Sequence, residues 1–352
     1  MLQIEIYSKL RRISVKFLKN RNHMKKFILL LFSIFITINI PAQDKKSAFS
    51  NILDRLSETK ADTSYVSCST YPFSIKTRIT TIINSSQLNW PETKNSLSLL
   101  AQPTFKIGFH VSYRGIGFGF QKDVIELLGK GKNSNIEISA NAYGRKFGGD
   151  ISYSTSSNYS INKLNGVLCN KDVEGVESKR IYANMYYVFN NKKFSYPAAL
   201  TQSYIQKRNC GSVIAGLSVY YNSLETTPTE LSLTTNNIIP AIDIMQHSQY
   251  YSLNFNVGYA YNWVLNRQWM IHCTALPSFS FINELKYKLQ DCTQHKRNSF
   301  NFAGIARLGV LWNYKRYYAG FTALTYVFET KYNSMSMIDM HTKAQIAFGV
   351  RF

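Results

Sequence analysis

The sequence predicts an all-β fold, a transmembrane antiparallel β-barrel of about 12 strands, within a range of roughly 10 to 14. Three observations lead to this prediction. The last strand alternates apolar and polar residues as far as the C-terminal Phe352, and alternation with a period of two dominates the chain before it. An export signal lies near the N-terminus of the 352 residues.

The N-terminal region has the pattern of an export signal. Lys25 and Lys26 precede an apolar run over residues 27–38, and Ala42 is a small residue at a cleavage site. The run is shorter than the about 20 residues that a transmembrane helix needs. We therefore expect a non-structural extension or over-long gene start at 1–23, a signal peptide at 24–42, an N-terminal periplasmic segment at 43–70 and the barrel at 71–352.

The chain is strongly basic, with a net charge of +21. Its basic residues are scattered through strands and loops, without a nucleic-acid motif, and an exported chain meets little nucleic acid. We therefore expect no nucleic-acid partner, and we attribute the excess to lipopolysaccharide or to a cation-lined lumen. The five cysteines lack metal-ligand spacing, so neither a metal nor another cofactor is expected.

The clearest strand covers residues 251–261. Its aliphatic and Phe residues lie at the centre, with Tyr at both ends, and the positions between them are small or polar. This pattern predicts a lipid-facing surface between two aromatic girdles, with a polar lumen behind it. A soluble sandwich also alternates, but its outward face carries more Lys and Glu. The same alternation predicts strands at 73–83, 105–113, 136–138 and 343–352.

Connection lengths predict the topology, because outer-membrane barrels have short periplasmic turns and long external loops. Short turns are expected at 102–104, 144–146, 265–268 and 313–315, and long external connections at 84–96, 223–248, 283–298 and 329–341. At Arg114-Gly115 the apolar phase slips by one, which indicates a bulge or a tight hairpin. The order of turns favours one bulged strand over 105–121. Segment 191–211 is too long for a periplasmic turn, so it either folds into the lumen or contains a further strand pair.

Several motifs resemble a known family. They are Asp62-Thr63-Ser64-Tyr65, Ser112-Tyr113-Arg114-Gly115-Ile116-Gly117, Tyr186-Tyr187-Val188-Phe189-Asn190, Phe194-Ser195-Tyr196-Pro197-Ala198-Ala199, Gln202, Gln206-Lys207-Arg208, Gly211-Ser212 and Gly216-Leu217. Over roughly residues 60–352 the chain resembles outer-membrane proteins of the Bacteroides type, classed as domain of unknown function 4421. The resemblance implies the fold and the location and adds no activity. Ala101-Gln102-Pro103-Thr104 departs from the Tyr-x-Pro-Asn-like turn expected before the third strand.

Charged residues at predicted inward positions form the first candidate site. They are Lys76, Arg78, Lys106, His110, Glu137, Asp150, Arg307, Lys343 and Arg351. Cations outnumber carboxylates in this set, and an excess of cations in a low-dielectric wall favours anionic solutes. The favoured alternative is a narrow barrel whose lumen these side chains fill as a structural core.

The family block is the second candidate site, comprising Phe194, Ser195, Tyr196, Pro197, Gln202, Gln206, Arg208 and Gly211. If the block enters the lumen, its polar residues line or gate a passage. The alternative is a packing corner at the barrel rim, built by Pro197 and the two alanines that follow it.

Two pairs of residues meet the first requirement of a hydrolase, a hydroxyl beside a histidine on one strand face. The pairs are His110 with Ser112 and His272 with Thr274. Neither pair has an evident third orienting group, so we predict no catalytic residue.

These patterns favour passage or binding of a small anionic solute by a barrel in the outer membrane of a Gram-negative bacterium. A membrane-embedded hydrolase is one alternative, and a surface assembly or adhesion platform acting through loops 159–179, 223–248 and 283–298 is another. The expected partners are outer-membrane lipid, lipopolysaccharide and the barrel assembly machinery. For that machinery, Phe348, Val350 and Phe352 form the assembly signal.

Overall fold

The computed structural model of the chain describes residues 61–91, 94–129, 135–227, 235, 246–288, 293–298, 301–332 and 335–352. The predicted extension at 1–23, the signal peptide at 24–42 and most of the segment at 43–70 lie outside these residues. Within the described part, no helix is long and apolar enough to cross a bilayer.

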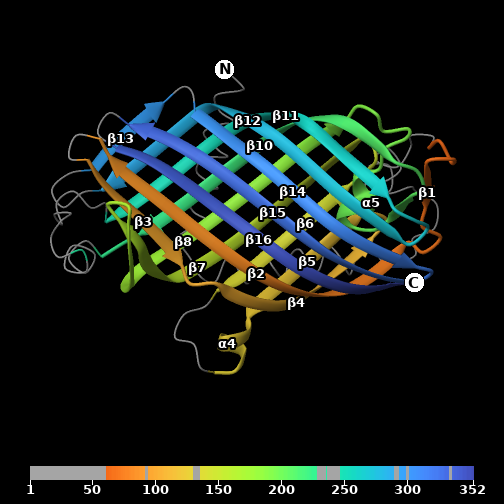
Figure 1. The fold of residues 1–352 in the computed structure, drawn as a ribbon, viewed down its shortest axis with the longest axis horizontal. Coiled ribbons are helices and arrows are strands. Elements are labelled where there is room, and N and C mark those ends of the chain that lie inside the picture. The colour runs from red at the N-terminus through yellow and green to blue at the C-terminus, as the bar shows by residue number, and fades with distance from the viewer. Residues whose placement is uncertain are drawn as a thin grey trace, which may run out of the picture. The chain divides into compact units, whose positions relative to one another are not determined.

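Twelve antiparallel strands of the described chain close into a barrel (Figure 1). In order around the wall they are β2 (Phe73–Trp90), β4 (Thr104–Tyr113), β5 (Ile116–Asp123), β6 (Ile136–Tyr143), β7 (Phe147–Leu164), β8 (Val167–Val188), β10 (Cys210–Glu225), β11 (His247–Val264), β12 (Trp269–Lys288), β14 (Asn301–Tyr314), β15 (Tyr317–Tyr332) and β16 (Met335–Arg351). β16 pairs back with β2, so the wall closes on itself. Closure gives the wall's backbone groups partners that hydrocarbon cannot supply. The predicted transmembrane barrel of about twelve strands is confirmed.

The barrel is apolar outside and polar inside. On β4, Phe105, Ile107 and Phe109 are 54%, 40% and 50% exposed, whereas the alternate residues Lys106 and His110 are buried. A continuous exposed apolar surface of this kind is the exterior of a membrane barrel. We call the end that holds Phe73 and Phe352 the proximal end, and the opposite end the distal end.

The set of strands that forms the wall between β2 and β7 differs between the two ends of the barrel. β3 (Asn95–Ala101) and β4 both pair with β2, and Gln102-Pro103 interrupts the strand between them. In the distal part β3 pairs directly with β7, whereas in the proximal part β4, β5 and β6 lie between β2 and β7. The short helix α4 (Val124–Leu127) follows β5 and projects outward from the wall (Figure 1).

The structure corrects the prediction of one bulged strand over 105–121. Arg114 and Gly115, with φ of 47° and 88°, form a two-residue turn between β4 and β5. Two residues with positive φ are typical of the tight hairpin turns that fit strand twist. The predicted periplasmic turn at 102–104 is therefore wrong, because Pro103 lacks the N–H group to continue the ladder and only interrupts one descending strand. The predicted loop 84–96 is also wrong, since β2 extends to Trp90.

Three predicted external loops are largely strand. Residues 159–179 belong to the hairpin of β7 and β8, which turns at Asn165-Gly166. Most of 329–341 lies in β15 and β16, and 283–298 contains the end of β12 and strand β13 (Thr293–Asn298). On the hairpin of β7 and β8 the buried residues Tyr159, Ile161, Val173 and Val176 are apolar, and exposed positions such as Lys171, Asp172 and Glu177 are charged. The outward apolar pattern therefore ends here while the hydrogen-bond ladder continues. Of loop 223–248, residues 228–234 and 236–245 lie outside the described residues.

The short turns predicted at 144–146 and 265–268 join neighbouring strands of the wall as expected. The turn predicted at 313–315 lies at 315–316, because β14 extends to Tyr314. These turns are brief because the flanking strands end at the same level of the barrel.

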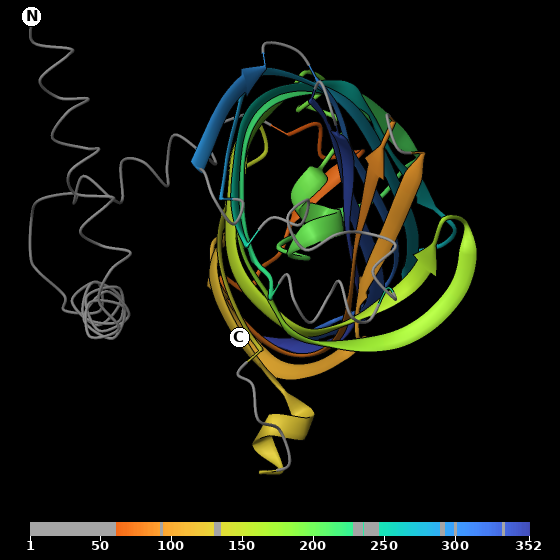
Figure 2. The same ribbon diagram turned by 90° about the vertical axis from the view of Figure 1, so that its left-hand side faces the viewer.

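Residues 189–209, which we call the plug, fold into the proximal lumen. The plug contains helix α5 (Tyr196–Leu200) and strand β9 (Tyr204–Gln206), and β9 pairs with β1 (Val66–Cys68). Figure 2 shows α5 inside the ring of strands. The hydroxyl of Ser195 caps α5 by accepting the N–H of Ala198 at 3.3 Å. Of the two predicted alternatives for 191–211, entry into the lumen is therefore correct, and the extra strand pair is this small sheet rather than part of the wall.

Candidate functional site in the lumen

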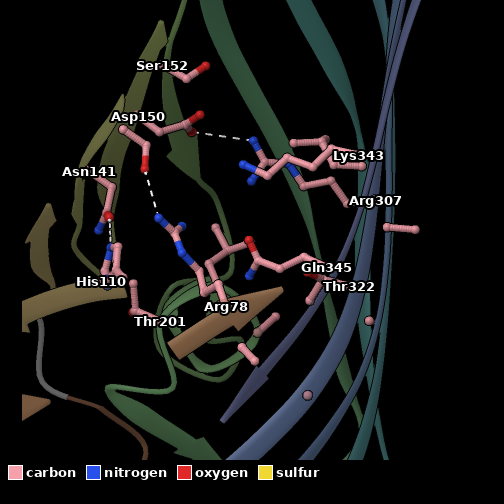
Figure 3. A pocket seen from close by; sticks show the side chains of 18 of the residues that line it. Arg78, His110, Asn141, Asp150, Ser152, Thr201, Arg307, Thr322, Lys343 and Gln345 are labelled. Carbon is pink, nitrogen blue, oxygen red and sulfur yellow. Dashed lines mark hydrogen bonds and ion pairs between the residues drawn. The ribbon is translucent and has the colours of Figure 1, made fainter. Parts of the chain in front are cut away.

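The structure places all of the predicted lumen residues inside the barrel, with their side chains buried or nearly so. Most of them line a cavity of about 150 Å³ next to the plug (Figure 3). The predicted residues that line it are Lys76, Arg78, His110, Glu137, Asp150, Arg307 and Lys343. Lys106 and Arg351 do not line it, so the predicted set divides into groups with different tasks.

Two of the cations form ion pairs across the lumen. Lys343 donates to Glu137, and Arg307 lies 3.4 Å from the carboxylate of Asp150. Because each carboxylate here neutralises a buried cation, these pairs fix the wall of the cavity rather than leave a charge available.

Lys106 and Arg351 serve the backbone. The Lys106 ammonium donates to the carbonyl groups of Ile136 and Thr155, at 3.1 and 3.5 Å, where β5 and β6 end beside β7. The Arg351 guanidinium donates to the carbonyl of Gln202 in the plug and lies over the ring of Tyr318. These two residues satisfy acceptors that an irregular wall and a plug leave over.

Lys76 and Arg78 differ from the other lumen cations. Each is 6% exposed, and neither lies within ion-pair distance of a carboxylate in the described part of the chain. Lys76 donates at 3.4 Å to the carbonyl of Leu200, and Arg78 donates at 3.4 Å to the hydroxyl of Ser139 while its Nε has no partner among the described residues. Two adjacent buried cations with unused donors can bind an anion through charge-assisted hydrogen bonds.

His110 completes this side of the cavity. Its Nε2 lies 2.8 Å from Oδ1 of Asn141, and its Nδ1 has no hydrogen-bond partner within the described segments. Figure 3 shows Arg78 between this pair on one side and Arg307 with Lys343 on the other. The site therefore presents several nitrogen donors to a small space.

Glycines on β5 make room for these side chains. A Cβ at Gly119 would clash with Nη2 of Arg78, and one at Gly117 would clash with Cε1 of His110. The alternation of glycine at 115, 117 and 119 is visible in the sequence, and it marks a strand face against which larger side chains pack closely.

The two hydroxyl and histidine pairs have different contacts. The Ser112 hydroxyl contacts Ser74 at 2.8 Å and not His110. His272 lies 2.7 Å from both Asn262 and Thr274, but Asn262 in turn donates to the carbonyl of Ser195. This chain of contacts anchors the plug to β11 and β12.

A family model with the description "Domain of unknown function (DUF4421)" matches residues 60–352. This chain belongs to the DUF4421 family. The match includes the wall, the plug and the cavity, and it confirms the family resemblance predicted from the motifs. No curated protein matches the chain.

Several solved structures are similar to this DUF4421 chain. The outer-membrane protease OmpT from Escherichia coli is 7% identical, with 80% of this chain and 96% of that chain covered and a TM-score of 0.37. The translocator domain of the autotransporter NalP from Neisseria meningitidis is 9% identical, with coverages of 78% and 88% and a TM-score of 0.37. The toluene transporter TodX from P. putida is 8% identical, with coverages of 84% and 93% and a TM-score of 0.31.

The family block builds the plug of this DUF4421 barrel. Phe194, Ser195, Tyr196 and Pro197 are buried, and burial raises the pKa of the Tyr196 hydroxyl. Gln206 accepts the N–H of Ser195 at 2.9 Å and donates to the carbonyl of Lys193 at 2.7 Å. Gln202 lines the cavity, whereas Arg208 is exposed beside the ring of Tyr65 and Gly211 pairs with Tyr261 as the second residue of β10.

A second buried network lies in the distal lumen, and sequence reasoning missed it. Arg180 lies 3.7 Å from Asp339, which also accepts the hydroxyls of Ser86 and Tyr220. The ring of Tyr220 stacks on that of Phe328 at 3.9 Å. The inward parity of β16 would have identified Asp339 if 329–341 had been assigned to strands instead of a loop, and extending β8 into the predicted loop 159–179 would have fixed the parity of Arg180.

The described part of the DUF4421 chain contains no group of three or more His, Cys, Asp or Glu side chains arranged to hold a metal ion.

Proposed function

We propose that this DUF4421 protein lies in a bacterial outer membrane and binds a small anionic solute in its lumen. The observation that carries the proposal is the position of Lys76 and Arg78, two buried cations beside a cavity that have no carboxylate partner among the described residues. The other lumen cations described above are matched by carboxylates or by shorter contacts with backbone carbonyls, whereas Lys76 and Arg78 each have one contact at 3.4 Å, with the Leu200 carbonyl and the Ser139 hydroxyl.

The chemistry of the cavity limits the solute. Burying a charge in a protein interior is costly unless the charge is paired. A bound carboxylate, sulfate or phosphate would accept hydrogen bonds from Lys76 and Arg78. It would also accept one from His110 when the ring nitrogen Nδ1 carries a hydrogen. A volume of about 150 Å³ is similar to that of a cavity that holds one benzene molecule, so a ligand with about six heavy atoms fits.

Passage through the barrel requires movement of the plug. The plug fills the proximal lumen on one side of the cavity, and the network of Arg180, Asp339 and Tyr220 fills the distal lumen. We propose that the proximal end faces the periplasm, because it carries the short turns between wall strands. The protein then acts as a gated binding barrel, in which release follows a change in the plug.

Isothermal titration calorimetry on the detergent-purified barrel tests the proposal, with acetate, sulfate, phosphate and lactate as probes. We expect at least one probe to bind, and we expect Arg78→Gln and Lys76→Gln each to weaken binding by roughly 10- to 100-fold. This corresponds to the about 1.5–3 kcal/mol that a hydrogen bond to a charged group contributes.

Lys331→Gln is the matched control, because Lys331 is an exposed cation at the distal end. The control should bind as the unmodified barrel does. Binding of every probe with unchanged affinity in the Arg78→Gln and Lys76→Gln variants would remove the basis of the proposal.

The two other hypotheses have less support. A hydrolase would use the Thr274 hydroxyl beside His272, whose ring Asn262 orients, or a hydroxyl beside His110. Thr274 is 1% exposed and does not line the cavity, and the Ser112 hydroxyl contacts Ser74 instead of His110. Ester hydrolysis that disappears in both His110→Ala and His272→Ala would reverse this ranking. A surface platform would use the distal loops, of which the structure describes mainly the hairpin ends.

A further inference from the structure

Basic residues occupy every proximal turn between neighbouring wall strands of the described chain. Arg114 lies between β4 and β5, Lys146 between β6 and β7, Arg267 between β11 and β12, and Lys315 with Arg316 between β14 and β15. We call these five residues the basic ring. Lys146 is half-buried and the others are exposed. Among the described residues, the proximal connections carry one acidic side chain, Asp62, which lies near the plug.

The distal end has a different charge pattern. Its lysines are interspersed with Asp172, Glu177, Glu225, Glu284 and Glu329, and Lys179 pairs with Glu225 at 3.5 Å. Mixed charges produce little net potential, whereas a ring of one sign attracts counter-charge. The proximal end therefore attracts anions more strongly than the described part of the distal end does.

The basic ring adjoins the aromatic girdle of the outer wall. The guanidinium of Arg114 lies 5.5 Å from the ring centre of Tyr113, the ammonium of Lys146 lies 5.5 Å from that of Phe147, and Lys315 lies 5.5 Å from that of Tyr314. These aromatic rings belong to the lipid-facing surface, since they are 36%, 49% and 43% exposed. Aromatic girdles mark the level of the membrane–water boundary, so the cations lie at the level of the lipid headgroups.

We propose that the basic ring binds the headgroups of anionic phospholipids in the membrane leaflet at the proximal end. Arg114, Lys146 and Lys315 lie beside lipid-facing rings, and no cation of the ring lies within ion-pair distance of a carboxylate in the described part of the chain, so a lipid phosphate oxygen can serve as the acceptor. A soluble polyanion is less suitable, because three of the five cations lie beside aromatic rings of the lipid-facing surface. The proposal is independent of the lumen site.

Native mass spectrometry of the full barrel tests this proposal, with phosphatidylglycerol and phosphatidylcholine of identical chains as the competing lipids. We expect the barrel to retain phosphatidylglycerol with at least about tenfold preference, and to lose that preference as the salt concentration rises from about 50 to 300 mM. The combined variant Arg114→Gln, Lys146→Gln, Lys315→Gln and Arg316→Gln should bind the two lipids equally.

The matched control removes the same number of charges at the distal end, by Lys94→Gln, Lys163→Gln, Lys286→Gln and Lys288→Gln, and it should keep the preference. A third variant, with Arg114→Lys, Lys146→Arg, Lys315→Arg and Arg316→Lys, keeps the ring's charge and should also keep it. Retained preference in the first variant, or equal loss in the distal control, would overturn the proposal. Tripolyphosphate, titrated into the same barrels, is the soluble probe. If the first variant loses tripolyphosphate binding and keeps its lipid preference, the ring binds a soluble polyanion instead of lipid.

Discussion

At the scale of single residues, Gly119 controls the position of the Arg78 guanidinium. A Cβ at Gly119 would contact only movable side-chain ends, those of Arg78 and Ser139, so Gly119→Ala should shift Arg78 without unfolding the barrel. We expect anion affinity to fall by roughly three- to tenfold, a part of the contribution of a charge-assisted hydrogen bond. Calorimetric titration of the variant measures this change.

Gly304→Ala is the control for that substitution, since no described atom lies within 4 Å of the position that a Cβ would take at this glycine of β14. It should leave both affinity and thermal stability unchanged. Equal affinities for the Gly119→Ala variant and the unmodified barrel would mean that Arg78 does not contact the solute.

Asp62 gives the segment before the barrel a pH response. Hydrogen bonds from the hydroxyl and the N–H of Ser64 lower the pKa of this carboxyl below its ordinary value of 3.8. The ionised carboxylate therefore contributes fully to the stability of this segment above pH 3.8, and the contribution is lost as the pH falls through the lowered pKa. A spin label on Cys68, with the other cysteines replaced by serine, should become more mobile only below pH 3.8. The same response in Asp62→Asn would contradict this assignment.

Strand parity located the lumen residues correctly but did not distinguish their tasks. Alternation along β2 and β4 is enough to direct Lys76, Arg78 and Lys106 inward. It is not enough to show that Lys106 meets the carbonyls of Ile136 and Thr155, because those acceptors come from other elements. Which cation is left over is a property of the assembled interior.

At the scale of elements, Asn262 is the main attachment of the plug to β11. Its amide donates to the carbonyl of Ser195 at 3.0 Å and to Gln206 at 3.3 Å, and its oxygen lies 2.7 Å from His272. Asn262→Ala should weaken plug docking by about 1–3 kcal/mol, because it leaves buried polar groups unpaired. In planar lipid bilayers we expect more frequent opening events than for the unmodified barrel.

Asn254→Ala is a matched control on the same strand, since Asn254 is also buried but bonds to Ser218 and Ser252 instead of the plug. It should not increase opening. If both variants open equally often, the plug is not held by Asn262 and a general loosening of the lumen explains the current.

The strands themselves were predictable where lipid covers them, and the hairpin ends were not. A period of two is visible in 251–261 because one face meets lipid and the other meets the lumen. Towards Asn165-Gly166 the apolar residues Tyr159, Ile161 and Val173 are buried inside, so the outward apolar pattern is absent although Asn-Gly is typical of a tight turn. Turn chemistry would have located this hairpin better than hydrophobic alternation did.

At the scale of the whole molecule, the C-terminal residue completes the barrel. The N–H of Phe352 donates to the carbonyl of Phe73 at 2.8 Å, and the N–H of Phe73 donates back at 3.2 Å. Deletion of Phe352 should lower the free energy of unfolding in lipid vesicles by about 1–3 kcal/mol, the net value of two hydrogen bonds. Urea titration followed by tryptophan fluorescence measures it.

Phe321→Ala removes one lipid-facing ring from β15 without touching these closing bonds, so it serves as the comparison. An equal loss of stability in both variants would show that the aromatic ring of Phe352, and not its backbone, is what matters.

The direct pairing of β3 with β7 has a consequence for how this architecture changes size. Since these two strands already meet in the distal part, the hairpin of β5 and β6 adds circumference only below that junction. A homologous chain that lost this hairpin, with β4 joining β7 in its place, would have a narrower proximal bore and would still have an even number of strands. The bore diameter in such proteins can therefore change by two strands at a time, while the remaining strands keep their pairing register.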